Sequence, residues 1–439
     1  MKNKFLIFLL SFLPALAWAG IPIQHWTHAN GAQVYLVEAK TIPMLDVQVD
    51  WMAGSVGDPA NKLGLASLTA GMIDKGSKLQ GRVVLESEIS DRLADLGASL
   101  SFSSAAEKAS MRLRTLSDPS RRDALVQLAA EVLKAPLFDA KILEREKARI
   151  IASIKEADLK PEVILSKEFD RQIYGQHPYG QAITVATIQA IHINDIKSFY
   201  ASRYAVKDAK ITIVGDITKT EADRLVAQLM ATLPAKAKVV TVAPPVELFD
   251  KKVSGGSVIK IPHAAQQAHI SMGMPTIARK DPDYFPMLVG NYVLGGGGFV
   301  SRLMKEVREK RGLAYSVYSY ISPGRQVGPY VAGMQTKKDQ ADLAVDVMKQ
   351  TISQFIASGP TDAELAIAKS NLINGFPLRI DSNRKILDNV ASVAWNDLPL
   401  DTLDTWTAQV QSVTKEQIMA AYKKHLDMDK LVTVIVGAP

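Results

Sequence analysis

The sequence predicts an α+β fold made of two homologous domains, and two observations support this prediction. Strand patterns and helix patterns are grouped along each half of the chain, which favours largely antiparallel sheets over a doubly wound parallel sheet. The second half also repeats landmarks of the first half at one constant offset in residue number. Self-similarity at a fixed offset is typical of a duplicated unit. The 439 residues are enough to build two hydrophobic cores.

The first copy shows its elements in a clear order. Alternating apolar and polar residues predict strands over residues 33–37 and 45–50. A helix follows, and further alternating patterns predict strands over residues 98–103 and 110–114. Two amphipathic helices and a last strand over residues 210–214 complete the copy.

The repeat itself is clearest near the end of each copy. The offset that separates Ile196 from Ile418 also separates three further pairs, which are Tyr200 and Tyr422, Gly215 and Gly437, and Lys147 and Lys369. We call this distance along the chain the repeat offset. Between the copies, residues 234–248 are rich in Pro, Ala, Lys and Val and predict a linker. We therefore expect the domains to span residues 20–233 and 249–439.

The N-terminal residues 1–19 have the pattern of a secretory signal peptide. Lys2 and Lys4 precede an apolar run, and Ala17-Trp18-Ala19 matches a cleavage site. The run is too short for a transmembrane anchor, and no later stretch is long enough to span a bilayer. We expect an exported chain that starts at Gly20 without a membrane anchor. In a Gram-negative cell its compartment would be the periplasm.

Composition excludes several classes of site. The chain contains no cysteine, which rules out disulfides, thiolate metal ligands and a cysteine nucleophile. The formal net charge is +7. Because the basic residues are dispersed and form no stripe with aromatic residues, the sequence does not predict a nucleic-acid partner.

The segment of residues 301–320 is the most informative stretch of the chain. It reads as a helix that ends near Arg308, a turn at Gly312, and a strand with alternating tyrosines that begins near Tyr315. From spacing alone, Arg308 would be a surface residue beside Glu309, and Tyr315 an ordinary sheet residue. The sequence on both sides of the pair changes this interpretation.

The segment resembles the C-terminal half of M16 zinc peptidases, the pitrilysin-type or processing-peptidase-like family. An Arg and a Tyr at this spacing reach into the active-site chamber of that family and bind the substrate peptide. The resemblance thus implies that Arg308 and Tyr315 hydrogen-bond the substrate carbonyl and the oxyanion that forms on it. It also implies two helix-covered, mainly antiparallel sheets that close like a clam.

The N-terminal half resembles the family's metal-binding half but lacks its metal-binding residues. Residues 51–66 are similar to the family's strand and turn before the metal helix, which then continues H-x-x-E-H in active members. At those positions this chain has Ser67, Ala70 and Gly71. Residues 144–155 resemble the segment with the third ligand, and Ala152 and Ser153 occupy its carboxylate positions.

The lost residues are those that the chemistry requires. Histidines at i and i+4 share one helix face and can hold one Zn²⁺, while the Glu between them activates the metal-bound water. Ser67, Ala70, Gly71 and Ser153 are therefore vacated positions and not ligands. The sequence predicts no metal and no catalytic residue in this chain alone.

The resemblance implies a role in a complex. Some family members divide their work between two chains, of which one carries the zinc motif and the other the Arg/Tyr pair. This chain fits the second role, a non-catalytic subunit that binds peptide substrates beside an exported homologue with intact H-x-x-E-H, and zinc would belong to that partner. The alternative is a non-enzymatic scaffold or peptide-binding homologue, in which the pair is retained for packing.

Three other segments attract attention. Residues 295–298 form a run of glycines that lacks the phosphate-loop frame, and we expect a flexible turn there. Residues 53–57 are a near match to a serine nucleophile elbow, but a plain turn at a strand end fits better. Residues 96–104 resemble the family's edge strand, which pairs with the substrate backbone.

Overall fold

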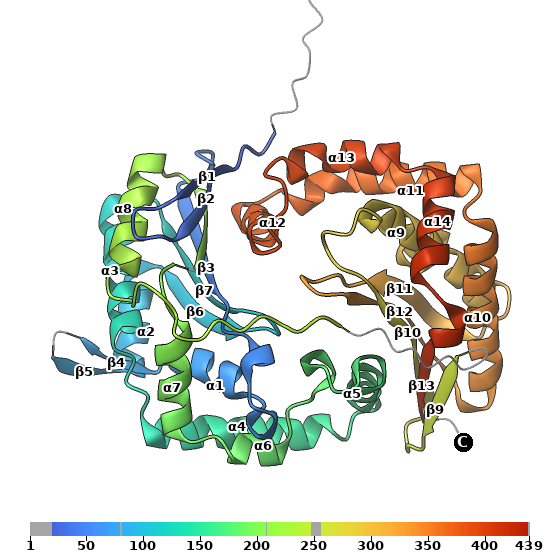
Figure 1. Ribbon diagram of the computed structural model, residues 1–439, viewed down its shortest axis with the longest axis horizontal. Coiled ribbons are helices and arrows are strands. Elements are labelled where there is room, and N and C mark those ends of the chain that lie inside the picture. Colours follow the sequence, from blue (N-terminus) through green and yellow to red (C-terminus); the bar gives the residue numbers. More distant parts are fainter. Residues whose placement is uncertain (1–19, 80, 208, 247–255, 438–439) are drawn as a thin grey trace, which may run out of the picture.

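The computed structural model describes residues 20–79, 81–207, 209–246 and 256–437 (Figure 1). The predicted signal peptide, residues 1–19, lies outside the described residues, as do the junction between the predicted linker and second domain and the last two residues. Residues 234–246 of the predicted linker contain no helix or strand. Among the described helices, none combines the length and apolar composition that crossing a bilayer requires.

The first half is built on a six-stranded sheet in the order β1-β2-β8-β3-β7-β6. Its neighbours are antiparallel except for β2 and β8, which run parallel. The strands are β1 (Gln24–Thr27), β2 (Gln33–Glu38), β3 (Met44–Trp51), β6 (Ser99–Ser104), β7 (Ala109–Leu116) and β8 (Lys210–Gly215). As predicted, β6 is an edge strand.

Helices cover the outer face of this sheet and enclose the first hydrophobic core. A two-stranded hairpin of β4 (Gly76–Leu79) and β5 (Arg82–Leu85) extends from this layer. The helices of the first half are α1 (Leu65–Met72), α2 (Glu86–Leu96), α3 (Pro119–Lys134), α4 (Ala140–Ala157), α5 (Pro161–Tyr174), α6 (Val185–Gln189), α7 (Ile193–Arg203) and α8 (Lys219–Met230).

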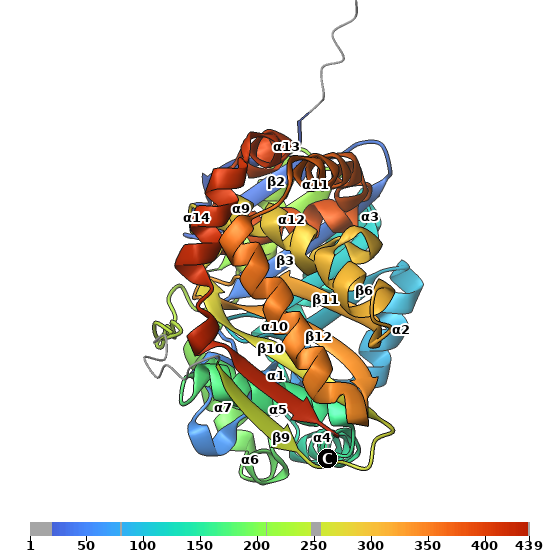
Figure 2. The same cartoon turned by 90° about the vertical axis from the view of Figure 1, so that its right-hand side faces the viewer.

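The second half has a five-stranded sheet in the order β11-β12-β10-β13-β9, with β13 and β9 parallel. Its strands are β9 (Ser257–Ile261), β10 (Gln267–Ile277), β11 (Ala314–Ile321), β12 (Gly328–Lys337) and β13 (Val432–Val436). Its helices are α9 (Tyr284–Asn291), α10 (Ala341–Ser358), α11 (Asp362–Gly375), α12 (Asn383–Trp395), α13 (Thr402–Ser412) and α14 (Lys415–His425). Figure 2 shows α10 and α14 across the outer face of this sheet.

The structure confirms the duplication that the sequence predicts. Helices α7 and α14 begin at Ile193 and Lys415, which are separated by the repeat offset. The helix caps repeat as well, because Asp139 caps α4 and Thr361, at the same offset, caps α11 with its side-chain oxygen. Each cap accepts backbone N–H groups that a helix start leaves unsatisfied.

The two halves exchange one helix each, and we call α5 and α12 the crossover helices. They begin at Pro161 and Asn383, again separated by the repeat offset. Helix α5 belongs to the first half in sequence but packs on β10 and β13, whereas α12 packs on β8 and β3 of the first sheet (Figure 1). Each crossover helix therefore covers the inner face of the other half's sheet.

The packing of the crossover helices follows from their sequences. Leu165, Phe169 and Ile173 recur every four residues on α5 and form an apolar cluster with Val434 and Val436 of β13. On α12 the equivalent stripe contacts the first sheet; its members are Leu387, Val390, Val393 and Ala394, packed with Tyr35, Val37 and Val214. Residues at this spacing share one helix face, so each helix has one apolar side for the foreign sheet.

Polar contacts fix the same boundary between the halves. The carboxylate of Glu107 accepts hydrogen bonds from Trp395 Nε1 at 3.2 Å and from the Tyr179 hydroxyl at 2.5 Å. Lys210 Nζ donates to the carbonyl of Ala394 at 2.6 Å and pairs with Asp397. Glu107 and Lys210 each bind a residue of the second half, so the closed arrangement is held by apolar packing and by satisfied polar groups.

The packing of the crossover helices predicts that the two halves unfold together. Phe169→Ala should lower the free energy of unfolding by about 3–4 kcal/mol, because a nearly fully buried phenyl ring between the halves is removed. Urea denaturation followed by tryptophan fluorescence and by circular dichroism should still show one shared transition. Two separate transitions in the unmodified chain would contradict the account that the halves stabilise each other.

Candidate functional site

The start of helix α1 keeps the scaffold of a metal helix. The Asp58 carboxylate accepts hydrogen bonds from the backbone N–H groups of Gly64 at 2.8 Å and Ala66 at 2.9 Å. Gly64 has a φ of 100°, which allows the sharp turn into the helix. Burial raises the pKa of Asp58 to about 6, although the two backbone hydrogen bonds act in the opposite direction. The Asp58 carboxylate therefore fixes the position at which α1 begins.

The vacated positions offer no set of zinc ligands. Ser67 is exposed on α1, Ala70 is buried, and a Cβ added at Gly71 would meet no atom within 4 Å. Ser153 is exposed on α4, which packs against α1. Zinc in proteins is bound by imidazole, thiolate and carboxylate groups, whereas these residues supply only two hydroxyls. The residues present do not fit zinc.

Arg308 and Tyr315 are brought together by a turn of unusual backbone. Residues Met304–Glu309 form a π-helix, and Gly312, at a φ of 63°, turns the chain into β11. The pairing of β11 with β12 shifts register between Ala314 and Val317, so Tyr315 and Ser316 both face outward. The Arg308 guanidinium carbon lies 4.7 Å from the centre of the Tyr315 ring.

Arg308 differs from the next two cations along the chain, Lys310 and Arg311, in having free donors. Lys310 and Arg311 both pair with Glu306, at 2.7 and 2.9 Å. The Arg308 side chain forms no hydrogen bond or ion pair with a described residue, and its guanidinium rests on the rings of Tyr315 and Phe299 instead. Tyr315 is 83% exposed. The pair therefore presents a guanidinium and a phenol whose hydrogen-bonding groups are available to another molecule.

The glycine run before this turn corrects one expectation. We predicted a flexible turn over residues 295–298, but Gly295 and Gly296 end a π-helix that spans Tyr292–Gly296. A Cβ at Gly295 would lie 2.3 Å from Ser319 Oγ, and one at Gly297 would lie 2.6 Å from the Tyr292 carbonyl oxygen. Gly295 is therefore required for close packing against Ser319 of β11, the strand that carries Tyr315, and Gly297 for close packing against Tyr292.

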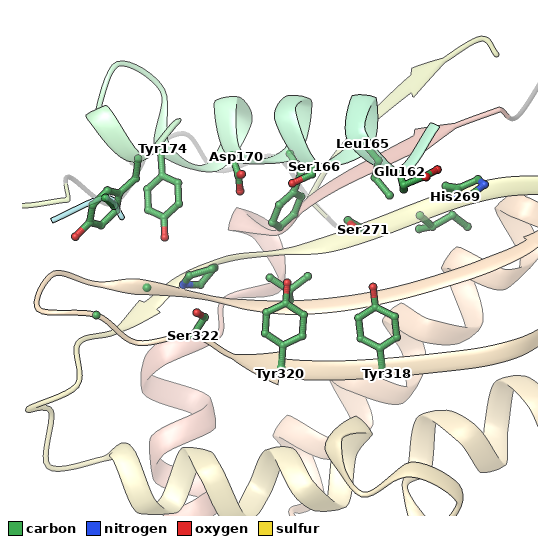
Figure 3. Close-up of a pocket in the computed structure, with 18 of the residues that line it drawn as sticks. Glu162, Leu165, Ser166, Asp170, Tyr174, His269, Ser271, Tyr318, Tyr320 and Ser322 are labelled. Carbon is green, nitrogen blue, oxygen red and sulfur yellow. The ribbon is translucent and has the colours of Figure 1, made fainter. Parts of the chain in front are cut away.

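A cavity of about 1110 Å³ lies between the two halves. Helix α5 lines one side with Glu162, Ser166, Asp170 and Tyr174, and β11 lines the other side with Tyr318 and Tyr320 (Figure 3). A smaller hollow of about 580 Å³ lies beside it, under Arg308 and Phe299. Because Tyr315, Ser316, Tyr318 and Tyr320 line both spaces, the Arg/Tyr pair lies at the margin of the larger cavity.

Glu107 and Lys108 at the large cavity are paired, whereas Asp170 is not. Glu107 is held by Trp395 and Tyr179, and Lys108 pairs with the buried Asp50 at 2.9 Å. The Asp170 carboxylate forms no hydrogen bond or ion pair with any described residue. Burial raises the pKa of Asp170 to about 6, and Tyr174 and Tyr320 are its titratable neighbours.

A second group of potential ligands lies on the outer side of the second half. One ligand atom each from Asp281, Asp283 and His425 falls within 4.8 Å of the others. Asp283 already has partners within the protein, because His425 Nε2 and Lys424 Nζ both contact its Oδ2 at 2.8 Å. The cluster connects the end of α14 to the start of α9, and we interpret it as a structural contact.

The structure brings together some predicted site residues and separates others. Arg308 and Tyr315 meet, as their spacing predicts. Ser67, Ala70, Gly71 and Ser153 line neither the large cavity nor the small hollow. Sequence reasoning missed Asp170, Tyr318 and Tyr320. The alternation of tyrosines along β11 was the available signal for the last two, whereas nothing in the sequence showed that α5 would face them.

Comparisons with known proteins agree with this geometry. The family model described as insulinase (peptidase family M16) matches residues 33–187, and the model described as peptidase M16 inactive domain matches residues 190–372. The chain is 27% identical to the non-peptidase homolog YmxG of Helicobacter pylori, over 99% of this chain and 98% of that protein. It is 25% identical to an uncharacterized zinc protease of Streptomyces coelicolor, over 71% of this chain and 68% of that protein.

Solved structures show the same architecture. The crystal structure of a peptidase M16 inactive domain from Pseudomonas fluorescens has a TM-score of 0.88 and 33% identity, and the match covers 95% of this chain and 98% of that one. The crystal structure of a protease from Helicobacter pylori has a TM-score of 0.83 at 19% identity, covering 95% of this chain and 100% of that one. This second likeness concerns the fold alone.

The vacated positions can be tested by restoring ligands. A variant with Ser67→His, Ala70→Glu, Gly71→His and Ser153→Glu should retain stoichiometric zinc after dialysis, as measured by elemental analysis. The reason is that the two imidazoles share one face of α1 and that the space beside Gly71 is open. The matched control keeps Gly71 and should retain little zinc. A folded variant with all of these changes but without zinc would show that the scaffold is not preserved.

The unpaired Asp170 predicts a dependence of stability on pH. Since its folded pKa is raised to about 6, the folded state holds a proton that the unfolded state loses between about pH 4 and 6, and stability falls as pH rises through this window. Asp170→Asn should therefore raise the free energy of unfolding by about 1–2 kcal/mol at pH 7.5 and change it little at pH 4.

Urea titrations at the two pH values measure this difference. Asp91→Asn, at an exposed aspartate of α2, is the matched control and should change the free energy of unfolding very little at either pH. A less stable Asp170→Asn variant at pH 7.5 would mean that the carboxylate has a partner which stabilises its charge.

Proposed function

Because the chain belongs to the M16 peptidase family as a homologue without the family's zinc-binding residues, we propose that it is the non-catalytic subunit of a heteromeric zinc peptidase. Its partner is a homologue of similar size with an intact H-x-x-E-H motif. The partner supplies the zinc and the general-base Glu, and this chain supplies Arg308 and Tyr315. The substrates are peptides that enter the space between the two chains.

The observation that carries this proposal is the unpaired Arg308 beside the exposed Tyr315. A guanidinium that served only for packing would gain by pairing with a carboxylate, as Lys310 and Arg311 do. Arg308 instead keeps its donors free and is oriented by two aromatic rings. Such a group can donate hydrogen bonds to a peptide carbonyl and to the oxyanion that develops on it, while Tyr315 adds a second donor.

The position of the pair supports a role across a subunit interface. The vacated positions on α1 and α4 do not share a cavity with Arg308 and Tyr315. A peptide bound at the pair would therefore meet its zinc on another chain. Tyr315 and Phe299, at 83% and 68% exposure, leave the pair accessible to a second chain.

The proposed complex is exported. The pattern of residues 1–19 supports secretion, and the mature chain would begin at Gly20 and act in the periplasm of a Gram-negative cell. The partner is then expected to carry a signal peptide of its own. We also propose that the chain divides into two domains at the predicted linker, residues 234–248.

The alternative is a non-enzymatic scaffold or peptide-binding homologue. The relative named non-peptidase homolog, which spans nearly the same length as this chain, favours this second candidate. In that case Arg308 and Tyr315 would contribute only to packing or to peptide binding. Addition of this chain would then not increase peptide cleavage by a zinc-containing homologue.

Substitution of Arg308 separates the two candidates. In the reconstituted pair, Arg308→Ala should lower kcat/KM for peptide cleavage by about a hundred- to a thousand-fold, because one oxyanion donor is lost. Assembly, measured by size-exclusion chromatography, should be unchanged. Arg279→Ala is a matched control, since Arg279 also stacks on a tyrosine, Tyr284, at 3.7 Å but does not line the cavity. Equal cleavage by the Arg308→Ala and Arg279→Ala pairs would reject the assigned role.

A further inference from the structure

The first described residues of the chain connect the two halves. Residues 20–23 lead from β1 of the first sheet toward α13 of the second half (Figure 1). There the backbone N–H of Ile21 donates a hydrogen bond to Asp404 Oδ1 of α13 at 2.7 Å. We call residues 20–23 the N-terminal strap, because they join the first half to the second.

The apolar side chains of the strap lie on the boundary between the halves. Ile21 and Ile23 are partly buried and pack against the apolar cluster that crossover helix α12 forms with the first sheet. Leu403, which precedes Asp404, belongs to the same cluster. Pro22, between the two isoleucines, is exposed. Because side chains alternate along an extended segment, one side of the strap is buried and holds its backbone beside α13.

Gly20 lies against the same carboxylate. A Cβ added at Gly20 would lie 2.6 Å from Asp404 Oδ1 and 3.1 Å from Oδ2. The α-nitrogen and such a Cβ are both bonded to Cα and lie about 2.5 Å apart, so this nitrogen is within about 5 Å of Oδ1. The absence of a side chain at residue 20 therefore allows the start of the strap to approach Asp404 closely.

The Asp404 carboxylate has room for a cation. Its side chain is exposed, and it accepts the hydrogen bond from the Ile21 N–H but forms no ion pair within the described part of the chain. A carboxylate presents two oxygens with about four lone-pair sites, so Oδ2 can accept a further donor. An ammonium group on Gly20 would therefore meet an anion that has no other charged partner there.

We propose that removal of residues 1–19 locks the two halves together through an ion pair between the new α-ammonium group of Gly20 and Asp404. Hydrolysis of the Ala19–Gly20 bond consumes one water and leaves a carboxylate on Ala19 and an amine on Gly20. The amine takes up a proton, as most α-amines do at neutral pH. Before cleavage residue 20 has a neutral amide nitrogen, so the lock forms only in the mature chain.

This inference rests on the proposed function in one respect, which is that export removes residues 1–19. It adds a role for the N-terminus that this cleavage creates. The strap crosses the same boundary as α5 and α12, and its isoleucines pack on the cluster of α12. The lock therefore couples maturation of the chain to the contact between its halves.

Acylation of the α-amine tests the ion pair directly. The mature chain is prepared with Gly20 as its first residue, and its reaction with an amine-selective ester at pH 7.5 is followed by mass spectrometry of the N-terminal peptide. Only the unprotonated amine reacts, and a nearby opposite charge keeps the amine protonated. Asp404→Asn should therefore raise the acylation rate about three- to tenfold, while Asn still accepts the Ile21 N–H.

A neighbouring aspartate provides the matched control. Asp401 is also exposed and immediately precedes the first turn of α13, but its side chain accepts no hydrogen bond from the strap, all of whose residues are described. Asp401→Asn removes the same charge from the same helix end and should change the acylation rate less than about twofold. A specific effect of Asp404→Asn would thus separate the ion pair from a general change in surface charge.

Melting temperatures show whether the ion pair also stabilises the chain. Acetylation of the α-amine removes its charge and should lower the Tm of the mature chain by about 1–2 °C, as expected for one exposed ion pair in a chain of this size. The same acetylation should not change the Tm of Asp404→Asn, because the ammonium group has no partner in that variant. The four samples form a double-mutant cycle that isolates the interaction.

The contrary outcomes are equally specific. Equal acylation rates in the unmodified chain and Asp404→Asn, equal acceleration by Asp404→Asn and Asp401→Asn, or equal effects of acetylation on Tm in both backgrounds would each overturn the inference. An exported chain whose first residue is not Gly20 would instead reject the maturation on which the inference rests. Failure of the proposed subunit role would show separately, as unchanged cleavage by the Arg308→Ala pair.

Discussion

The exchange of α5 and α12 is the constraint on which the rest of the structure depends. Each helix has one apolar side, and that side is buried on the sheet of the opposite half. The sheets are covered on their outer faces by their own helices, so the inner faces would be exposed without the exchange. The exchanged helices pack on the two sheets, and the cavity is lined by α5 together with β10, β11 and β12 of the second sheet.

The same architecture explains why some charged groups are paired and others are not. Where the halves meet, Glu107, Lys210 and Asp397 have partners, because a buried unpaired charge there would favour opening. Facing the cavity and its margin, the side chains of Asp170 and Arg308 have none among the described residues. Unsatisfied groups of this kind cost stability, and they are retained most readily where a ligand completes them. One is a carboxylate inside the cavity and the other a guanidinium at its margin.

The sequence predicted the α+β class and the duplication, because each leaves a local pattern or a fixed repeat offset, whereas the edge strand β6 was expected from the family resemblance of residues 96–104. It also placed Arg308 and Tyr315 at one turn. It did not predict that α5 covers the second sheet, since the apolar stripe of Leu165, Phe169 and Ile173 does not say which sheet it meets. For the same reason Asp170 could not be assigned to the large cavity. The turn expected at residues 295–298 was wrong for Gly295 and Gly296, which lie in a π-helix, because Gly295 serves there to admit Ser319, a packing constraint that composition does not reveal.

We propose that this chain completes a zinc peptidase whose metal lies in another chain. The most direct test of this proposal compares peptide hydrolysis by three samples, which are the isolated chain, a co-expressed homologue with H-x-x-E-H, and the mixture of the two. The metal content of each sample is measured alongside. We expect the isolated chain to be inert and free of stoichiometric zinc, and the mixture to cleave faster than the homologue alone until a chelator abolishes cleavage. Stoichiometric zinc and cleavage in the isolated chain would contradict it, as would a homologue whose cleavage is the same with and without this chain.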